Sequence, residues 1–247
     1  MLLGVAHAYP AGQESITPRL QPQPRMTSLP SHEFHALEPS IAARAWSHGW
    51  ALSRSTQSPV EHPGYLQIHV GKPDHLTRYV LPRLDHELLQ GLVADAGPGV
   101  WLKVCAPVER VRPLLTSDWA VHEPEFLMST ALAVSAAPAP AGYNVQTERV
   151  GALAIAKIHT DTGELAASGQ AAIDGAFATF DQIVTDEAHR RKGLGRWVMA
   201  ALCNAALERG ATHGVLVATE AGAALYQALG WALVSPVTAA SVPPSAG

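Results

Sequence analysis

One stretch of the sequence decides the fold: Thr185-Asp186-Glu187-Ala188-His189-Arg190-Arg191-Lys192-Gly193-Leu194-Gly195-Arg196. It follows an apolar run that predicts a strand over residues 176–185. It leads into an amphipathic pattern that predicts a helix over residues 192–209, ended by Gly210. The start of a helix leaves backbone N–H groups free and carries a partial positive charge, which together suit a phosphate.

The residue types in this stretch indicate an anionic ligand. Gly193 and Gly195 let an anion approach the backbone closely. Basic residues are unfavourable at a helix N-terminus, yet this one carries Arg190, Arg191, Lys192 and Arg196. We therefore expect these residues, with Leu194 between the glycines, to bind a diphosphate.

Two other phosphate-binding loops do not match this stretch. The dinucleotide pattern GxGxxG fails because Val198 stands where the third glycine belongs, and the pattern GxxxxGK[ST] is absent from the sequence. A nucleotide-dependent enzyme that uses the same loop remains an alternative, which predicts that ATP or NAD binds more tightly than other diphosphates.

The composition restricts the class of protein. The chain has 247 residues, of which 47% are hydrophobic and 15% charged, as expected for a globular protein with a sizeable core. The net charge of −4 argues against nucleic-acid binding and against a polybasic membrane anchor. No apolar run reaches the roughly 18 residues of a membrane span. Cys105 and Cys203 form no CxxC pair, and no histidine shows a metal-ligand spacing, so we expect a cytoplasmic protein without a metal.

Composition changes along the chain predict five segments. They are a loose proline-rich arm over residues 1–35, an N-terminal α/β half over residues 36–135, a linker over residues 136–142, a second domain over residues 143–238 and a disordered tail over residues 239–247. Met26, inside the arm, is a candidate natural start. In the N-terminal half we expect a helix over residues 41–52 and a helix from Asp74 to Ala94, bent at Pro82.

Two motifs together resemble a known family. Arg190, Gly193 and Gly195 match the core Arg/Gln-x-x-Gly-x-Gly/Ala of the acetyl-CoA motif of the GNAT superfamily of N-acetyltransferases, although Glu187 stands where many members have proline. Residues 224–231 are similar to the Leu-Tyr-x-x-x-Gly-Phe segment of that family, with tryptophan in place of phenylalanine. The resemblance covers about residues 145–235.

The resemblance implies a fold and an activity. It implies the mixed α/β GNAT fold of acyl-CoA N-acyltransferases for the C-terminal half, with an N-terminal half that matches only in its α/β texture and contributes to the acceptor site. It also implies direct transfer of an acetyl group from acetyl-CoA to a primary amine by general acid/base catalysis in a ternary complex. We expect a small-molecule acceptor (an amino acid, an analogue or an amine antibiotic) and a monomer or homodimer. A non-catalytic module that binds or senses acyl-CoA is the alternative.

The resemblance also suggests catalytic roles. Tyr226 occupies the position from which a family tyrosine approaches the CoA sulfur as a general acid, although its ring could simply pack in the core. Asp181 lies on the strand that often supplies the group acting on the amine. Alternation places it on one face with Phe177, Thr179 and Ile183, and so apolar a strand predicts a raised pKa. Asp181 could instead bind the cationic amine or make a structural hydrogen bond.

Further residues are expected to bind the substrates. The family uses this strand's backbone to pair with the pantetheine arm, here at Gln182, Ile183 and Val184. Thr219 stands where many members have an asparagine that holds the cofactor. Thr179, Trp119 and His122 are the candidates for lining the acceptor pocket.

Overall fold

A computed structural model describes residues 36–244 of the chain, which belong to one compact unit. The proline-rich arm over residues 1–35, with Met26, and the last three residues of the predicted tail lie outside the described residues. The helices are α1 (Pro39–Ser53), α2 (His86–Ala94), α3 (Val108–Val111), α4 (Leu194–Leu207) and α5 (Glu220–Ala228), with short 3-10 turns η1 (Arg112–Leu114) and η2 (Glu187–His189).

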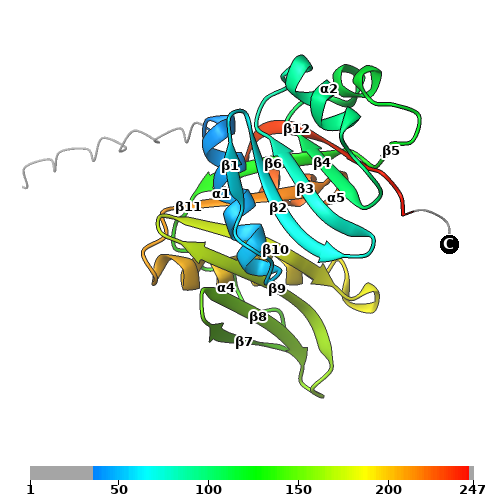
Figure 1. The fold of residues 1–247 in the computed structure, drawn as a ribbon. Coiled ribbons are helices and arrows are strands. Elements are labelled where there is room, and N and C mark those ends of the chain that lie inside the picture. Colours follow the sequence, from blue (N-terminus) through cyan, green and yellow to red (C-terminus); the bar gives the residue numbers. More distant parts are fainter. Residues whose placement is uncertain (1–35, 245–247) are drawn as a thin grey trace, which may run out of the picture. The chain divides into compact units, whose positions relative to one another are not determined.

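The strands form one mixed sheet (Figure 1). They are β1 (Val60–His62), β2 (Tyr65–Lys72), β3 (His75–Leu81), β4 (Val100–Val104), β5 (Ala120–Val121), β6 (Glu125–Ala131), β7 (Tyr143–Val150), β8 (Leu153–Thr160), β9 (Leu165–Asp174), β10 (Phe177–Thr185), β11 (His213–Thr219) and β12 (Ala232–Ser241). Their order is β1-β2-β3-β4-β12-β6-β11-β10-β9-β8-β7, with β5 paired to β12. The α/β class predicted from the sequence is confirmed.

The two halves of the chain exchange strands. Each half contains a parallel β-α-β unit, β3-α2-β4 in the first and β10-α4-β11 in the second. The strand β6, which ends the first half, pairs with β11 of the second half. The C-terminal strand β12 pairs in turn with β4 and β6 of the first half. One continuous sheet therefore runs through both halves, while residues 132–142 contain no helix or strand.

Alternation along β10 explains how two helices cover opposite faces of the sheet. Ala178 and Phe180 belong to the apolar cluster that includes the buried face of α4. Thr179 points to the other face, where its hydroxyl donates to the Ala45 carbonyl of α1 at 3.2 Å. The helix α1 lies across this face, against β9, β10 and β11 (Figure 1). It presents Trp46 and Trp50 to the sheet, so these two side chains mark the buried side of the helix.

Two expectations from the sequence are wrong. Residues 75–81 form the strand β3 and not a helix begun by Asp74. Successive side chains of the strand point to opposite faces, so Val80 packs in the apolar cluster with α1 and Leu81 packs in the cluster with α2. The helix α2 begins only at His86, where the Asp85 side chain caps it. Residues 239–241 are not disordered, because they lie in β12, are buried and pair with β4.

The close contact between α1 and β10 yields a stability prediction. A Cβ at Gly49 would lie 2.0 Å from the Thr179 hydroxyl oxygen, so no side chain fits there. We expect Gly49→Ala to lower the free energy of unfolding by about 2 kcal/mol, as overpacked cores do. Urea denaturation measures it. Gly91→Ala in α2 is the matched control, since nothing lies within 4 Å of its Cβ and alanine favours a helix. Equal effects of the two substitutions would contradict the close packing of α1.

Candidate active site

The site begins where two parallel strands separate. The strands β10 and β11 pair only over residues 177–179 and 213–215. The corresponding strands of the first half, β3 and β4, pair over residues 77–81 and 100–104, up to the ends of both strands. Beyond Thr179, therefore, the second half opens its sheet, whereas the first half keeps its sheet closed.

A bulge in β10 lies at this opening. The pairing of β10 with β9 shifts between Asp181 and Val184, and Gln182 has a positive φ of 56°. The bulge turns Ile183 toward α4, where it packs close to Gly169 and Val198. Ile183 therefore does not share a face with Asp181, as simple alternation predicted, because the extra residue reverses the order of the faces. Val184 is exposed beyond the bulge.

The glycine-containing loop precedes α4 as predicted. Gly193 adopts a φ of 79° at the N-cap, and no side chain caps the helix. The helices α1, α2 and α5 differ in this respect, since Glu38, Asp85 and Thr219 cap them with side-chain oxygens. The first backbone N–H groups of α4 are thus left without a side-chain acceptor.

Basic side chains surround this helix start. Arg190, Arg191, Lys192 and Arg196 are all exposed. Lys192 donates to the Tyr143 hydroxyl at 3.1 Å, and Gly195 lies so close to α5 that a Cβ there would be 3.2 Å from a Leu225 methyl group. An uncapped 14-residue helix with four exposed basic groups at its start fits the diphosphate of a cofactor such as CoA.

The Thr219 hydroxyl has a structural use. It accepts a hydrogen bond from the Gly222 backbone at 3.3 Å and so caps α5. If Thr219 also contacts a cofactor, as the sequence predicts, its hydroxyl has to do so while it accepts this capping hydrogen bond.

Tyr226 is held inside the second half. It projects from α5, is 8% exposed and has its ring centroid 5.9 Å from that of Trp231. Burial, with a further contribution from the Asp181 charge, raises the pKa of Tyr226 to about 12. Its hydroxyl therefore keeps its proton at neutral pH and can donate a hydrogen bond.

Asp181 lies on the α1 side of the opening and is an ion-pair partner. Its carboxylate accepts from Arg54 Nε at 2.6 Å and Nη2 at 3.0 Å, and from the Ser53 hydroxyl at 2.5 Å. Burial alone would raise the pKa of Asp181, but the bonds from Arg54 and Ser53 outweigh it and lower the pKa. The raised pKa expected from the sequence is wrong, because the neutralising partners come from a helix far away in the chain.

A polar cavity of about 290 Å³ lies beneath α1 and includes Asp181. Sequence reasoning missed the other residues around it, because they come from separate elements. They are Trp46, Trp50, Arg54 and Thr56 from the α1 region, Val70, Lys72, His75 and Arg78 from β2 and β3, and Lys103, Glu125 and Val217 from β4, β6 and β11.

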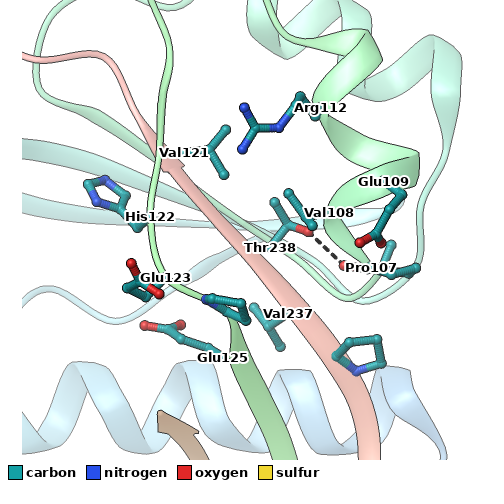
Figure 2. Close-up of a pocket in the computed structure, with 13 residues that line it drawn as sticks. Pro107, Val108, Glu109, Arg112, Val121, His122, Glu123, Glu125, Val237 and Thr238 are labelled. Atoms are coloured by element: carbon teal, nitrogen blue, oxygen red, sulfur yellow. Dashed lines mark hydrogen bonds between the residues drawn. The ribbon is translucent and has the colours of Figure 1, made fainter. Parts of the chain in front are cut away.

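The predicted acceptor residues do not gather at this cavity. Thr179 is buried under α1, and Trp119 is buried in the apolar cluster of α2 and β4. His122 stacks on Trp101 with ring centroids 4.6 Å apart and bonds to the Ser241 hydroxyl. It lines a different cavity, of about 420 Å³, between α3 and β12 (Figure 2). Glu125 borders both cavities.

No group of three or more metal-ligating side chains occurs among residues 36–244. No helix in this part of the chain is long and apolar enough to cross a membrane.

The opened parallel strands, the bulge and the uncapped glycine-led helix define an α/β protein that can hold a diphosphate cofactor between diverging strands. Residues 110–231 match the acetyltransferase (GNAT) family, and this region of the chain belongs to that family. No curated protein matches the sequence.

Solved structures agree with this assignment at the level of the fold. The chain is similar to a GCN5-related N-acetyltransferase from Kribbella flavida, with a TM-score of 0.61 and 17% identity, over 84% of this chain and 96% of that one. It is also similar to a GCN5-related N-acetyltransferase from Sphaerobacter thermophilus, with a TM-score of 0.54 and 12% identity, over 85% of this chain and 96% of that one. The likeness extends through both halves, so the N-terminal half is part of the shared architecture.

The ion pair at Asp181 can be tested by titration. We expect Arg54→Met to raise the pKa of Asp181, because burial of the carboxyl group is then no longer offset. Carbon-detected NMR titration of the Asp181 carboxyl group measures it. Arg44→Met, which removes an ion pair with Glu61 elsewhere on α1, is the control and should leave the titration unchanged. An unchanged pKa in Arg54→Met would show that other groups keep Asp181 ionised.

The same substitution has a consequence for acid stability. Since the folded-state pKa of Asp181 is lowered, its stabilisation is present above the unfolded-state pKa and is lost as the pH falls through the folded-state value. The wild-type protein should therefore lose more stability on acidification than Arg54→Met does.

Proposed function

We propose that the chain is an acetyl-CoA-dependent N-acetyltransferase that transfers the acetyl group directly to a primary amine of a small molecule. The observation that carries the proposal is the separation of β10 and β11 beyond Thr179. The basic loop leads into α4 on one face of this opening, and the cavity with Asp181 lies on the face covered by α1. A cofactor and an acceptor can therefore approach one another from opposite sides of the sheet.

The cofactor contacts follow from the backbone. The free N–H groups at the start of α4 and the four basic side chains would hold the pyrophosphate of CoA. The backbone of residues 182–184, displaced by the bulge, would lie beside the pantetheine arm. Bound acetyl-CoA supplies a thioester carbonyl that an amine can attack.

Two features of the chain favour the proton transfers of the reaction, which are loss of a proton from the amine and protonation of the departing sulfur. Tyr226 carries a hydroxyl proton at neutral pH and is the donor for the departing sulfur. The cavity is rich in cations, which disfavour the ammonium form of an amine and so lower its pKa. We assign Asp181 an orienting role, in which its carboxylate fixes Arg54 at the edge of the cavity.

A thiol-release assay with acetyl-CoA and a panel of small primary amines tests the activity, with mass spectrometry to identify the N-acetylated product. Transfer to at least one amine is expected. Tight CoA binding without transfer to any amine would contradict the proposal and favour a non-catalytic acyl-CoA-binding module.

The loop has a matched pair of variants. Gly193 and Gly210 flank α4 with φ values of 79° and 84°, and nothing lies within 4 Å of either Cβ. Valine strains both backbones similarly, but only Gly193 adjoins the free N–H groups. We expect Gly193→Val to weaken CoA binding about tenfold or more, as the loss of charge-assisted hydrogen bonds does. Gly210→Val should retain the affinity for CoA.

Isothermal titration calorimetry with CoA, ATP and NAD measures the effect. Tighter binding of ATP or NAD than of CoA by the wild-type protein would overturn the cofactor assignment.

The role of Tyr226 can be tested by removing its hydroxyl. We expect Tyr226→Phe to lower kcat about 100-fold, the scale of a lost general acid, while the affinity for CoA stays the same. Steady-state kinetics and calorimetry separate the two effects. Tyr65→Phe, at the start of β2 and outside the cavity, is the control. An unchanged kcat in Tyr226→Phe would reduce Tyr226 to a packing residue.

A further inference from the structure

We propose that the cavity beneath α1 binds the acceptor by a carboxylate group that pairs with Arg78, and that the acceptor's amine points to the place where β10 and β11 separate. This inference rests on the proposed function and names the class of its acceptor: small amines that also carry a carboxylate.

Arg78 is a buried cation without a hydrogen-bonded counter-ion. It is 7% exposed, and its Nε has no hydrogen-bond partner among residues 36–244. Its guanidinium lies 3.9 Å from the centroid of the Trp50 ring and 5.8 Å from that of Trp46. Glu125 and Asp181 act on it only through their charge, without a hydrogen bond. A buried charge is costly unless it is paired and hydrogen-bonded, so this arrangement calls for an anion from outside the chain.

Two of the other cations around the cavity are already neutralised. Arg54 pairs with Asp181, and Lys103 pairs with Glu125. Lys72 adds a further basic group, and it is exposed. Four basic side chains thus face two carboxylates, both of which are engaged. Of the two cations without an ion pair, Lys72 and Arg78, only Arg78 is buried.

The geometry favours a carboxylate. Because the guanidinium lies against the indole of Trp50, the N–H groups along its edge remain free for a planar partner. A carboxylate can accept two parallel hydrogen bonds from such an edge. The volume of about 290 Å³ suits a small molecule.

The same cavity orients the amine. Asp181 and Val217, which line it, lie two residues beyond the last paired residues of β10 and β11. An acceptor whose carboxylate binds Arg78 therefore extends toward the opening in the sheet. Its amine meets a cation-rich surface there, which favours the neutral, nucleophilic form.

Matched acceptors test the inference on the wild-type protein. The pairs are L-alanine with L-alaninol, L-phenylalanine with L-phenylalaninol, and γ-aminobutyrate with its alcohol. We expect kcat/KM to be about 100-fold higher for the best carboxylate than for its alcohol, the scale of one buried charge pair. Phosphoethanolamine and taurine form separate arms. Preference for either of these over every carboxylate would overturn the carboxylate assignment.

A variant of Arg78 provides the second arm. Arg78→Met keeps an apolar contact with Trp50 and removes the charge, so we expect the preference for carboxylates to fall to about threefold or less. Calorimetry with the best carboxylate acceptor in the presence of CoA should show the same loss in binding. Arg83→Met is the control, because Arg83 pairs with Glu38 and does not line the cavity. A preference that survives Arg78→Met in the folded protein would overturn the inference.

Failure of this inference differs from failure of the proposed function. Transfer to alcohols and carboxylates at similar rates overturns the acceptor class and leaves the acetyltransferase intact. CoA binding without transfer to any amine removes the activity itself.

Discussion

The parallel pairing of β10 with β11 is short, and the rest of the site depends on that shortness. After residues 177–179 the two strands separate, and the bulge at Gln182 follows within three residues. The helix between these strands then begins with Gly193 at an opening in the sheet, and Tyr226 follows from the helix after β11. The first half uses the same β-α-β connection with its strands paired to their ends. The first half therefore contributes side chains to the wall of the cavity beneath α1, but its own parallel strands do not separate.

Positive charge is distributed unevenly in a protein whose net charge is −4. One concentration is exposed, at the start of α4, where the basic side chains can meet a diphosphate in water. The other is enclosed, where Arg54, Arg78 and Lys103 surround the cavity beneath α1. Burial lowers the pKa of Lys103 to about 8 and that of Arg78 to about 10. Tryptophan rings lie against the buried Arg78, where a carboxylate of the chain would be the usual partner.

The local features of the second half could be predicted from the sequence because each depends on neighbouring residues. The glycine loop, the helix after it and the segment around Tyr226 are short patterns of this kind. The charge state of Asp181 could not be predicted, because Arg54 lies 127 residues away in the chain. The cations of the cavity were missed for the same reason, since α1, β3 and β4 meet only in the folded sheet. The roles of Trp119 and His122 in acceptor binding stay predictions, because an aromatic or histidine in a loop-like segment has no sequence pattern that separates packing from binding.

The exchange of strands between the halves has a consequence for the folding of the chain. The edge of β4 is covered by β12, which is far from β4 in the sequence. Pairings between residues so distant in sequence form slowly, and an uncovered strand edge attracts other chains until its partner arrives. Until β12 pairs, the first half therefore has an open edge at β4, and a strand from the second half is needed to close it. The same strand lines the cavity beside His122, so folding of the second half also completes the wall of that cavity.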